Sequence, residues 1–148
     1  MKTRISIQQN DFDIAAEIAA LNAAGVGAIA TFCGLVRPDD NLTALTLEHY
    51  PDMTEREIAR IVGEAQTRWP LLGITIIHRV GRMVPRDKIV LVAVAASHRS
   101  AAFAACDFLM DYLKTKAPFW KQEERGGGVT WVEAKSSDER AAERWREK

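Results

Sequence analysis

The chain has 148 residues, 47% of them apolar, and its 20 basic and 20 acidic residues leave no net charge when histidine is neutral. This length fits one globular domain that buries about two-thirds of the surface of its unfolded chain. With no excess charge, neither nucleic acid nor a membrane is expected as a partner, so any anion site must be local. Because the N-terminus lacks an apolar signal core and no run reaches transmembrane length, we expect a cytoplasmic protein.

The first half of the chain predicts a strand, a helix, two strands and a second helix. Their expected bounds are Thr3–Gln8, Phe12–Ala24, Val26–Val36, Leu42–Tyr50 and Thr54 to about Trp69. Asp11 or Asp13 should begin the first helix, and Gly25 should end it. Thr54-Glu-Arg-Glu57 has the pattern of a capping box for the second helix. The segment Arg37–Asn41 is expected to be the turn between the two strands.

The second half predicts a strand pair, a long helix, two short strands and a charged terminal helix. Their expected bounds are Ile74–Met83, Lys88–Ala96, Ser97 or Ser100 to about Lys116, Phe119–Glu124, Val129–Ala134 and 136–148. Arg125–Gly128 contains three glycines and is expected to be a hairpin turn, since it matches no phosphate-loop pattern. Ser136–Glu139 is a second capping box, and Trp145 is the one large apolar residue of the helix that it opens.

Strands occur in neighbouring pairs with single helices between them. This order favours an α+β fold, with a mostly antiparallel sheet and helices packed on it, over a doubly wound sheet. No internal repeat or low-complexity linker divides the sequence, so residues 1–148 are expected to form a single domain.

The two cysteines, Cys33 and Cys106, stand alone. Neither belongs to a CxxC motif or lies near a histidine pair at zinc spacing, which argues against a disulfide framework and against a metal site. We expect Cys106 to pack as a small apolar residue. A catalytic thiol at Cys33 is an alternative that the sequence does not favour.

Lys114 and Lys121 lie on either side of Pro118, which lacks an amide donor and pushes the preceding residue toward extended angles. The helix that carries Lys114 should therefore end near Lys116, and Lys121 should lie on the extended segment that follows. Two ammonium groups on different elements can converge on one anion and act as base or nucleophile. The alternative, which this motif alone favours, is two solvated lysines near a helix end.

Three other segments concentrate groups that bind anions: Phe32–Arg37, Ser97–Ser100 and Gln122–Glu123. The first ends in an arginine, whose planar fork can hold a phosphate or carboxylate at two points. The second begins a helix, where free amides and the helix dipole favour an anion. Taken singly, each is explained as well by an ion pair, a cap or a surface charge. His49 and His78 lie inside strand patterns and are expected to be structural.

Six blocks of the sequence, taken in order, resemble the large catalytic subunit of molybdopterin synthase, the MoaE family. They are Phe32–Arg37, Leu45–Met53, His78–Gly81, Ser97–Arg99, Ala102–Phe103 and Asp111–Glu123. The last block contains the rare spacing Lys-x-x-x-Pro-x-Trp-Lys. Together the blocks span almost the whole chain, and they favour a functional role for the two lysines over the solvated alternative.

The resemblance implies an α/β-hammerhead fold and an enzyme of molybdenum cofactor biosynthesis. In that family, a small ubiquitin-like subunit, MoaD-like, inserts a C-terminal Gly-Gly tail that ends as a thiocarboxylate. Two sulfur transfers convert cyclic pyranopterin monophosphate to molybdopterin. Two large subunits form a homodimer with one small subunit at each far end, which gives a heterotetramer. No cofactor and no metal are implied for the large subunit.

By matching position, the resemblance implies that Lys114 is the essential lysine nearest the thiocarboxylate and the reacting carbon. It implies that Lys121 helps to bind the tail and the substrate and to move protons. The substrate-binding positions implied by the resemblance are Leu35, Val36, Arg37, His98, Arg99, Lys121, Gln122 and Glu123. Lys135, which follows Trp131–Ala134, is implied as a residue that reaches a neighbouring subunit's pocket.

Some positions depart from the family pattern. Cys33 replaces a residue that commonly carries a hydroxyl, and Leu35 stands where related chains often have lysine, which removes one possible phosphate contact. The turn Val84–Asp87 lacks an expected glycine. A competing hypothesis is a non-catalytic module that binds an anionic metabolite or a ubiquitin-like tail. Arginine could replace both lysines in such a module, but it could not transfer protons.

Overall fold

The computed structural model describes residues 1–39, 41–132 and 136–146, without the side chains of 136–139. This part of the chain forms two four-stranded sheets and four helices. The first sheet contains, in spatial order, β1 (Lys2–Gln8), β4 (Leu71–Arg79), β6 (Lys88–Ala96) and β2 (Ala28–Leu35). The second contains β5 (Gly81–Met83), β3 (Leu42–His49), β7 (Phe119–Arg125) and β8 (Gly128–Val132). The helices are α1 (Ile14–Leu21), α2 (Met53–Arg68), α3 (Arg99–Thr115) and α4 (Ser136–Glu143).

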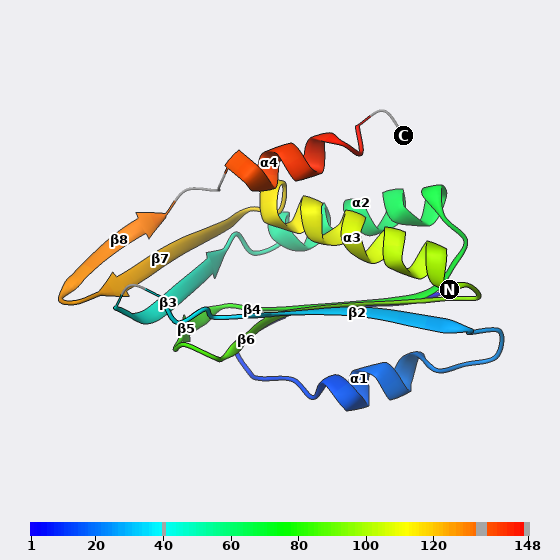
Figure 1. Ribbon diagram of the computed structural model, residues 1–148, viewed down its shortest axis with the longest axis horizontal. Helices are drawn as coiled ribbons and strands as arrows, with labels where there is room; N and C mark the ends of the chain where they lie inside the picture. The colour runs from blue at the N-terminus through cyan, green and yellow to red at the C-terminus, as the bar shows by residue number, and fades with distance from the viewer. Residues whose placement is uncertain (40, 133–135, 147–148) are drawn as a thin grey trace.

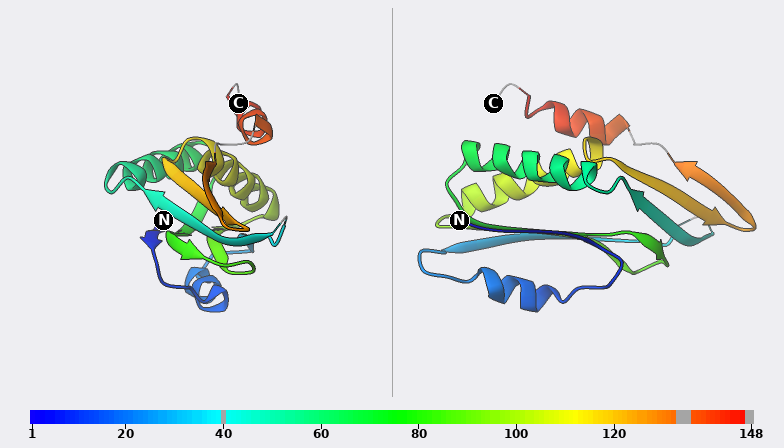
Figure 2. Two further views of the ribbon diagram at one scale, coloured as in Figure 1. Left: turned by 90° about the vertical axis from the view of Figure 1, so that its left-hand side faces the viewer. Right: turned by 180° about the vertical axis from the view of Figure 1, so that it is seen from behind.

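The helices lie on both sides of the first sheet. Helices α2 and α3 cover one face and α1 covers the other, while α4 packs on the side of α3 away from the sheet (Figure 1). The second sheet extends from one end of the first, beyond the helices, as Figure 1 and the right-hand view in Figure 2 show. No helix in the described part of the chain is long and apolar enough to cross a membrane.

The main core lies between the first sheet and helices α2 and α3. Strand β6 is buried on both faces, so its side chains form a continuous apolar run instead of an alternating one. Val92 faces the helices and packs in one cluster with Phe108 of α3. Leu91, the preceding residue, points to the other face and packs with Phe12 next to α1.

The α+β class and the mostly antiparallel pairing are confirmed. Only the pair of β1 with β4 is parallel among the pairings of the described residues. The prediction of one strand over Ile74–Met83 is wrong, because the chain changes sheets at Val80. Strand β4 pairs with β6, whereas β5 pairs with β3 in the second sheet. Gly81, with φ of 92°, adopts a left-handed conformation at this crossing, which glycine tolerates.

The capping box predicted at Thr54 is wrong, and the observed one begins two residues earlier. Helix α2 is capped at Asp52, whose backbone N–H donates to Glu55 Oε1 at 2.9 Å. Thr54 is fully buried inside the helix instead. Its hydroxyl accepts from the Tyr50 N–H and donates to the Pro118 carbonyl, both at 2.9 Å. Thr54 therefore ties the start of α2 to the connection between α3 and β7.

Two other helix boundaries differ from the predictions. Asp13 caps α1 as predicted, with its carboxylate accepting from the Ala16 N–H at 3.2 Å, but the helix is shorter than expected and ends at Leu21. Helix α3 has His98 at its N-cap position and no side-chain hydrogen bond there, so neither Ser97 nor Ser100 is the cap. The start of α3 thus leaves its first amides without a side-chain acceptor.

Two of the predicted turns have left-handed residues. In the hairpin between β7 and β8, Gly126 and Gly127 have φ of 44° and 96°, which confirms the role predicted for the glycines. In the turn Val84–Asp87, Arg86 takes φ of 81° where a glycine would avoid strain. The Asp87 carboxylate accepts from the Val84 N–H at 2.9 Å and holds this turn closed.

Trp145 attaches the C-terminal segment to α3. Its ring packs edge-on against Trp69 and Phe108, with centroid distances of 5.7 and 5.5 Å. Its indole N–H donates to Asp111 Oδ2 at 2.6 Å. The capping box predicted at Ser136–Glu139 depends on side chains outside the described part of the structure.

Candidate active site

A cavity of about 690 Å³ lies where the first sheet, the C-terminal end of α3 and the second sheet meet. Its lining residues with charged or titratable side chains are Cys33, Arg37, Asp39, His78, Lys114, Lys121, Glu123 and Arg125. Apolar side chains, among them Leu45, Leu47 and Leu113, complete the wall. The cavity therefore combines an apolar surface with a concentration of cations.

Both predicted lysines line this cavity, and they lie on different elements as the proline predicts. Helix α3 ends at Thr115, and the Lys116 N–H donates to the Tyr112 carbonyl at 2.7 Å as the last helical bond. Lys114 is in the last turn of α3, whereas Lys121 is in the middle of β7, paired with Leu47 of β3. The Pro118 connection turns the chain so that the two side chains share one cavity.

Strand β7 presents alternate side chains to the cavity. Phe119, Lys121, Glu123 and Arg125 all line it. Gln122 does not, because neighbouring residues of a strand point to opposite faces of the sheet. The structure therefore brings Lys121 and Glu123 together in the cavity and leaves Gln122 on the other face.

The end of β2 supplies a second wall. Leu35, Val36 and Arg37 line the cavity, as the resemblance implies. Val36 is almost fully buried, while Leu35 is 54% exposed at the surface of the cavity. The Val36 N–H donates to the Asp87 carbonyl at 2.8 Å, which fixes the backbone just before Arg37.

His98 and Arg99 are not in this cavity. They are exposed at the N-terminal end of α3, and Lys114 lies near its C-terminal end. Lys114 is fifteen positions after Arg99 in the helix, which corresponds to about 22 Å along the axis. A single copy of the chain therefore cannot bring these residues to one small ligand. Lys135 lies outside the described residues.

An ion-pair network at the cavity includes two residues that the sequence interpretation missed, Asp39 and Arg125. The Asp39 carboxylate contacts Arg125 Nη2 at 3.1 Å and Arg37 Nε at 3.6 Å. Arg125 also contacts Glu123 Oε1 at 3.2 Å. Arg125 lies four residues after Lys121 on the same face of β7, but the sequence interpretation ended this strand at Glu124 and placed Arg125 in the hairpin turn. The position of Asp39 in a turn gave no signal.

His78 forms part of the cavity wall at the end of β4. Its ring stacks on Phe119, with centroids 3.9 Å apart and planes 17° apart. Its Nδ1 lies 2.9 Å from the Arg79 carbonyl, and a carbonyl can only accept, so Nδ1 carries the proton. Burial, and to a lesser degree the charge of Lys114, lower the pKa of His78 to about 4. The imidazole is therefore neutral at physiological pH, and its Nε2 is an acceptor.

Neither cysteine has the environment of an activated thiol. Burial raises the pKa of Cys33, and it raises the pKa of Cys106 to about 11. Both thiols are therefore mostly protonated at neutral pH, whereas the thiolate is the nucleophile. Among the described residues, no cluster of three or more His, Cys, Asp or Glu side chains could hold a metal ion.

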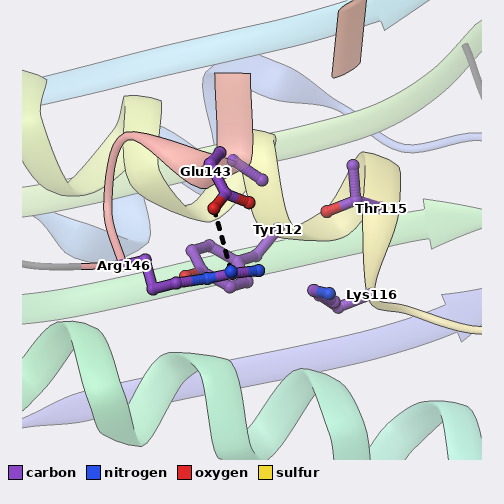
Figure 3. Close-up of a pocket in the computed structure, with 6 residues that line it drawn as sticks. Tyr112, Thr115, Lys116, Glu143 and Arg146 are labelled. Atoms are coloured by element: carbon purple, nitrogen blue, oxygen red, sulfur yellow. Dashed lines mark ion pairs between the residues drawn. The ribbon is translucent and has the colours of Figure 1, made fainter. Parts of the chain in front are cut away.

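A second, smaller hollow of about 360 Å³ lies between the end of α3 and α4. Figure 3 shows Lys116 and Thr115 on one side of it and Arg146 on the other. The Arg146 guanidinium contacts Glu143 Oε1 at 2.9 Å, so its charge is already balanced within the same segment. This hollow contains neither of the two lysines singled out by the sequence, and the larger cavity is the candidate active site.

Comparison with known proteins identifies the family. The profile of the family described as MoaE protein matches residues 7–116. The chain belongs to the MoaE family. A molybdopterin synthase catalytic subunit from Mesorhizobium japonicum is 56% identical over 147 residues, which cover 96% of this chain and 92% of that protein.

Solved MoaE structures have the same fold. The molybdopterin biosynthesis MoaE protein from Burkholderia ambifaria has a TM-score of 0.84 and 53% identity, with 98% of each chain covered. Molybdopterin synthase from Staphylococcus aureus has a TM-score of 0.81 and 28% identity, covering 86% of this chain and 96% of that one. The fold predicted for the MoaE family is therefore the fold of this chain.

Proposed function

We propose that this chain is the catalytic subunit of a molybdopterin synthase. It is a sulfurtransferase that converts cyclic pyranopterin monophosphate to molybdopterin, using two sulfurs from the thiocarboxylated C-terminal glycine of a small ubiquitin-like subunit. The observation that carries the proposal is the placement of Lys114 and Lys121, from two different elements, in one cavity of a MoaE-family chain. Similar proteins from Mesorhizobium japonicum and Vibrio cholerae are named molybdopterin synthase catalytic subunit.

The two lysines suit the chemistry of this reaction. The thiocarboxylate is anionic and already a good nucleophile, so the large subunit needs no thiol, which agrees with the protonated state of Cys33. Opening the cyclic phosphate turns a diester into a monoester, which carries more negative charge. Ammonium groups at Lys114 and Lys121 stabilise that developing charge and can transfer protons, which guanidinium groups cannot.

A glycine-rich tail suits the entry to this cavity. Without side chains, the tail can pass through a narrow channel and bring its terminus to the lysines. Apolar lining residues such as Leu45 and Leu47 would contact the tail backbone, and the cations would attract its charged end. Two such subunits with two tail-bearing partners give the heterotetramer. We place the enzyme in the cytoplasm, where the unpaired thiols of Cys33 and Cys106 stay reduced.

The position of His98 and Arg99 gives the homodimer a functional role. Because these residues lie about 22 Å along α3 from Lys114, they can hold the substrate phosphate or pterin only in the cavity of the other subunit. A mixture of two inactive variants, Arg99→Ala and Lys114→Ala, tests this. In a mixed dimer one cavity would keep both functional groups, so activity should reappear. If the mixture stays inactive although mixed dimers form, Arg99 does not act across the subunit interface.

The proposed function is tested by reconstitution. The chain is mixed with cyclic pyranopterin monophosphate and a small partner that ends either in a thiocarboxylate or in an ordinary carboxylate. Dithiolene product should form only with the thiocarboxylate, and two tails should be consumed for each product. If the thiocarboxylated partner binds but no product forms, the chain is a binding module instead of the catalytic subunit.

A further inference from the structure

We propose that Arg125 and Arg37 together bind the phosphate of the substrate, and that Asp39 occupies their guanidinium groups until the phosphate displaces it. The inference rests on the proposed function, and it adds a phosphate-binding residue and a competing internal anion. Arg125 was not among the positions implied by the family resemblance.

The geometry places one carboxylate between two guanidinium groups. Asp39 Oδ1 lies 3.1 Å from Arg125 Nη2, and Asp39 Oδ2 lies 3.6 Å from Arg37 Nε. Arg125 Nη1 also donates to the Asp39 backbone carbonyl at 3.2 Å. All three residues line the cavity that contains Lys114 and Lys121. One oxyanion thus already contacts both arginines on the wall of the active-site cavity.

Phosphate would make better-matched contacts than Asp39 at this position. The planar fork of arginine fits two oxygens of the cyclic phosphate, which as a diester carries one negative charge like a carboxylate, and the contacts strengthen when ring opening gives a monoester with more charge. The Asp39 and Arg125 side chains are 35% and 33% exposed, so water weakens their ion pair. Displacing Asp39 from Arg125 therefore costs little free energy. The phosphate therefore gains two guanidinium partners for the loss of a weak internal contact.

The remaining charges of the cavity support this assignment. Glu123 contacts Arg125 from the same strand, at 3.2 Å, and holds the guanidinium against the wall. With Asp39 displaced, the four cations Arg37, Arg125, Lys114 and Lys121 outnumber this single carboxylate among the described lining residues. Leu35, which also lines the cavity, contributes no charge.

The spacing along β7 fits a substrate that reaches from its phosphate to its reacting carbon. Lys121 and Arg125 are four residues apart on one face, about 13 Å between their Cα atoms. Both side chains are long enough to converge on adjacent groups of one ligand. Arg125 thus binds the phosphate while Lys121 remains near the reacting carbon.

The test measures binding of cyclic pyranopterin monophosphate to the chain alone, without the partner, by titration of pterin fluorescence. Arg125→Gln should weaken binding roughly five- to tenfold, because it removes a charge-assisted contact to the phosphate. Asp39→Asn should strengthen binding a few-fold, because it removes the competing anion, and this gain should shrink when Arg125→Gln is also present. Inorganic phosphate should compete with the substrate less well in Arg125→Gln.

Arg82→Gln is the matched control. Arg82 pairs with Glu124 at 3.1 Å in the same sheet, and neither residue lines the cavity. This variant should bind the substrate like the wild type. Circular dichroism and the melting temperature show whether each variant is folded.

Four results would overturn the inference. Unchanged substrate affinity in folded Arg125→Gln would show that Arg125 does not bind the phosphate. Weaker binding in Asp39→Asn would show that Asp39 does not compete with it. In either case the proposed function stands. Weaker association of the partner tail in Arg125→Gln, with unchanged substrate affinity, would assign Arg125 to the thiocarboxylate instead. If the wild-type chain bound no cyclic pyranopterin monophosphate, both the inference and the proposed function would fail.

Discussion

In the first sheet, strand β6 buries every residue from Val90 to Ala96, whereas in the second sheet no residue of β7 or β8 is buried. The two sheets belong to one chain and have the same number of strands. The first is covered by helices on both faces (Figure 1), and the second has one face on the cavity.

The two sheets therefore differ in role: the first contributes most of the stability, and the second carries functional side chains. Apolar burial in the first sheet and its helices supplies most of the folding free energy, because it removes the most apolar surface from water. The charged residues of β7 contribute little to stability, because exposed ion pairs are weak. Lys121 and Arg125 can therefore be substituted with little loss of stability, so the second sheet can be tested for function directly.

The largest expected effect is the loss of catalysis in Lys114→Ala. Product formation should fall by about 10²- to 10⁴-fold, as expected when a proton-transferring group is removed, while the fold and partner binding persist. Lys116→Ala is the matched control, since Lys116 is an exposed lysine two residues further along and does not line the cavity. Turnover at the wild-type rate in Lys114→Ala would remove this lysine from the catalytic machinery.

Replacing a core aromatic side chain should instead reduce the stability of the fold. Changing the fully buried Phe108 to Ala should lower the free energy of unfolding by about 3–5 kcal/mol. The same change at Trp120, which is 47% exposed on β7, should lower the free energy of unfolding by less than about 1 kcal/mol. Urea unfolding of both variants measures the difference, and similar losses at the two positions would contradict the division between the sheets.

A smaller effect concerns pH and His78, where the first sheet meets the cavity. Its pKa of about 4 in the folded chain is below the ordinary value of 6.5, so between these pH values the unfolded chain binds a proton that the folded chain does not. Stability from this residue is complete above pH 6.5 and falls as the pH drops toward 4, by about 3 kcal/mol in total.

His78→Phe provides the comparison, because it keeps a ring against Phe119 and removes the titrating group. The difference in unfolding free energy between wild type and variant should change between pH 6.5 and 4. The acid sensitivity of the carboxylates is common to both proteins and cancels. A difference that stays constant over this range would mean that His78 is not held neutral by the fold.

The smallest expected effect is that of Cys33→Ser. The thiol lines the cavity but is mostly protonated, so the serine variant should keep its activity within about twofold. Cys106→Ala should likewise keep its activity. Complete loss of sulfur transfer in Cys33→Ser would instead support a thiol mechanism.

Local rules predicted that Lys114 and Lys121 lie on two different elements, whereas their role in a site was implied by the family resemblance. Pro118 must end the helix after Lys114, and the strand that follows must carry Lys121, so placement on two elements followed from backbone chemistry. Strand alternation puts the Gln122 side chain on the face opposite Lys121, which the residue pattern alone did not show. Within one copy of the chain, the length of α3 keeps Arg99 away from Lys114, so its predicted role requires a second subunit.

Other features depend on contacts that no local pattern encodes. The change of sheets at Val80 follows from the pairing of β5 with β3, which is more than thirty residues earlier in the chain. Thr54 had the pattern of a cap, but tertiary contacts with Pro118 fix it inside the helix. Asp39 contributes to the site only because the fold brings its turn against Arg125.

Truncation of the partner's final Gly-Gly tests the central claim most directly, because the claim is that the cavity between the two sheets receives the sulfur-bearing tail. Association and product formation are measured with the intact and the truncated partner. The truncated body should still dock, through contacts outside the cavity, but product formation should vanish. Turnover that persists with the truncated partner would show that the tail is not the sulfur donor and would contradict this account of the site.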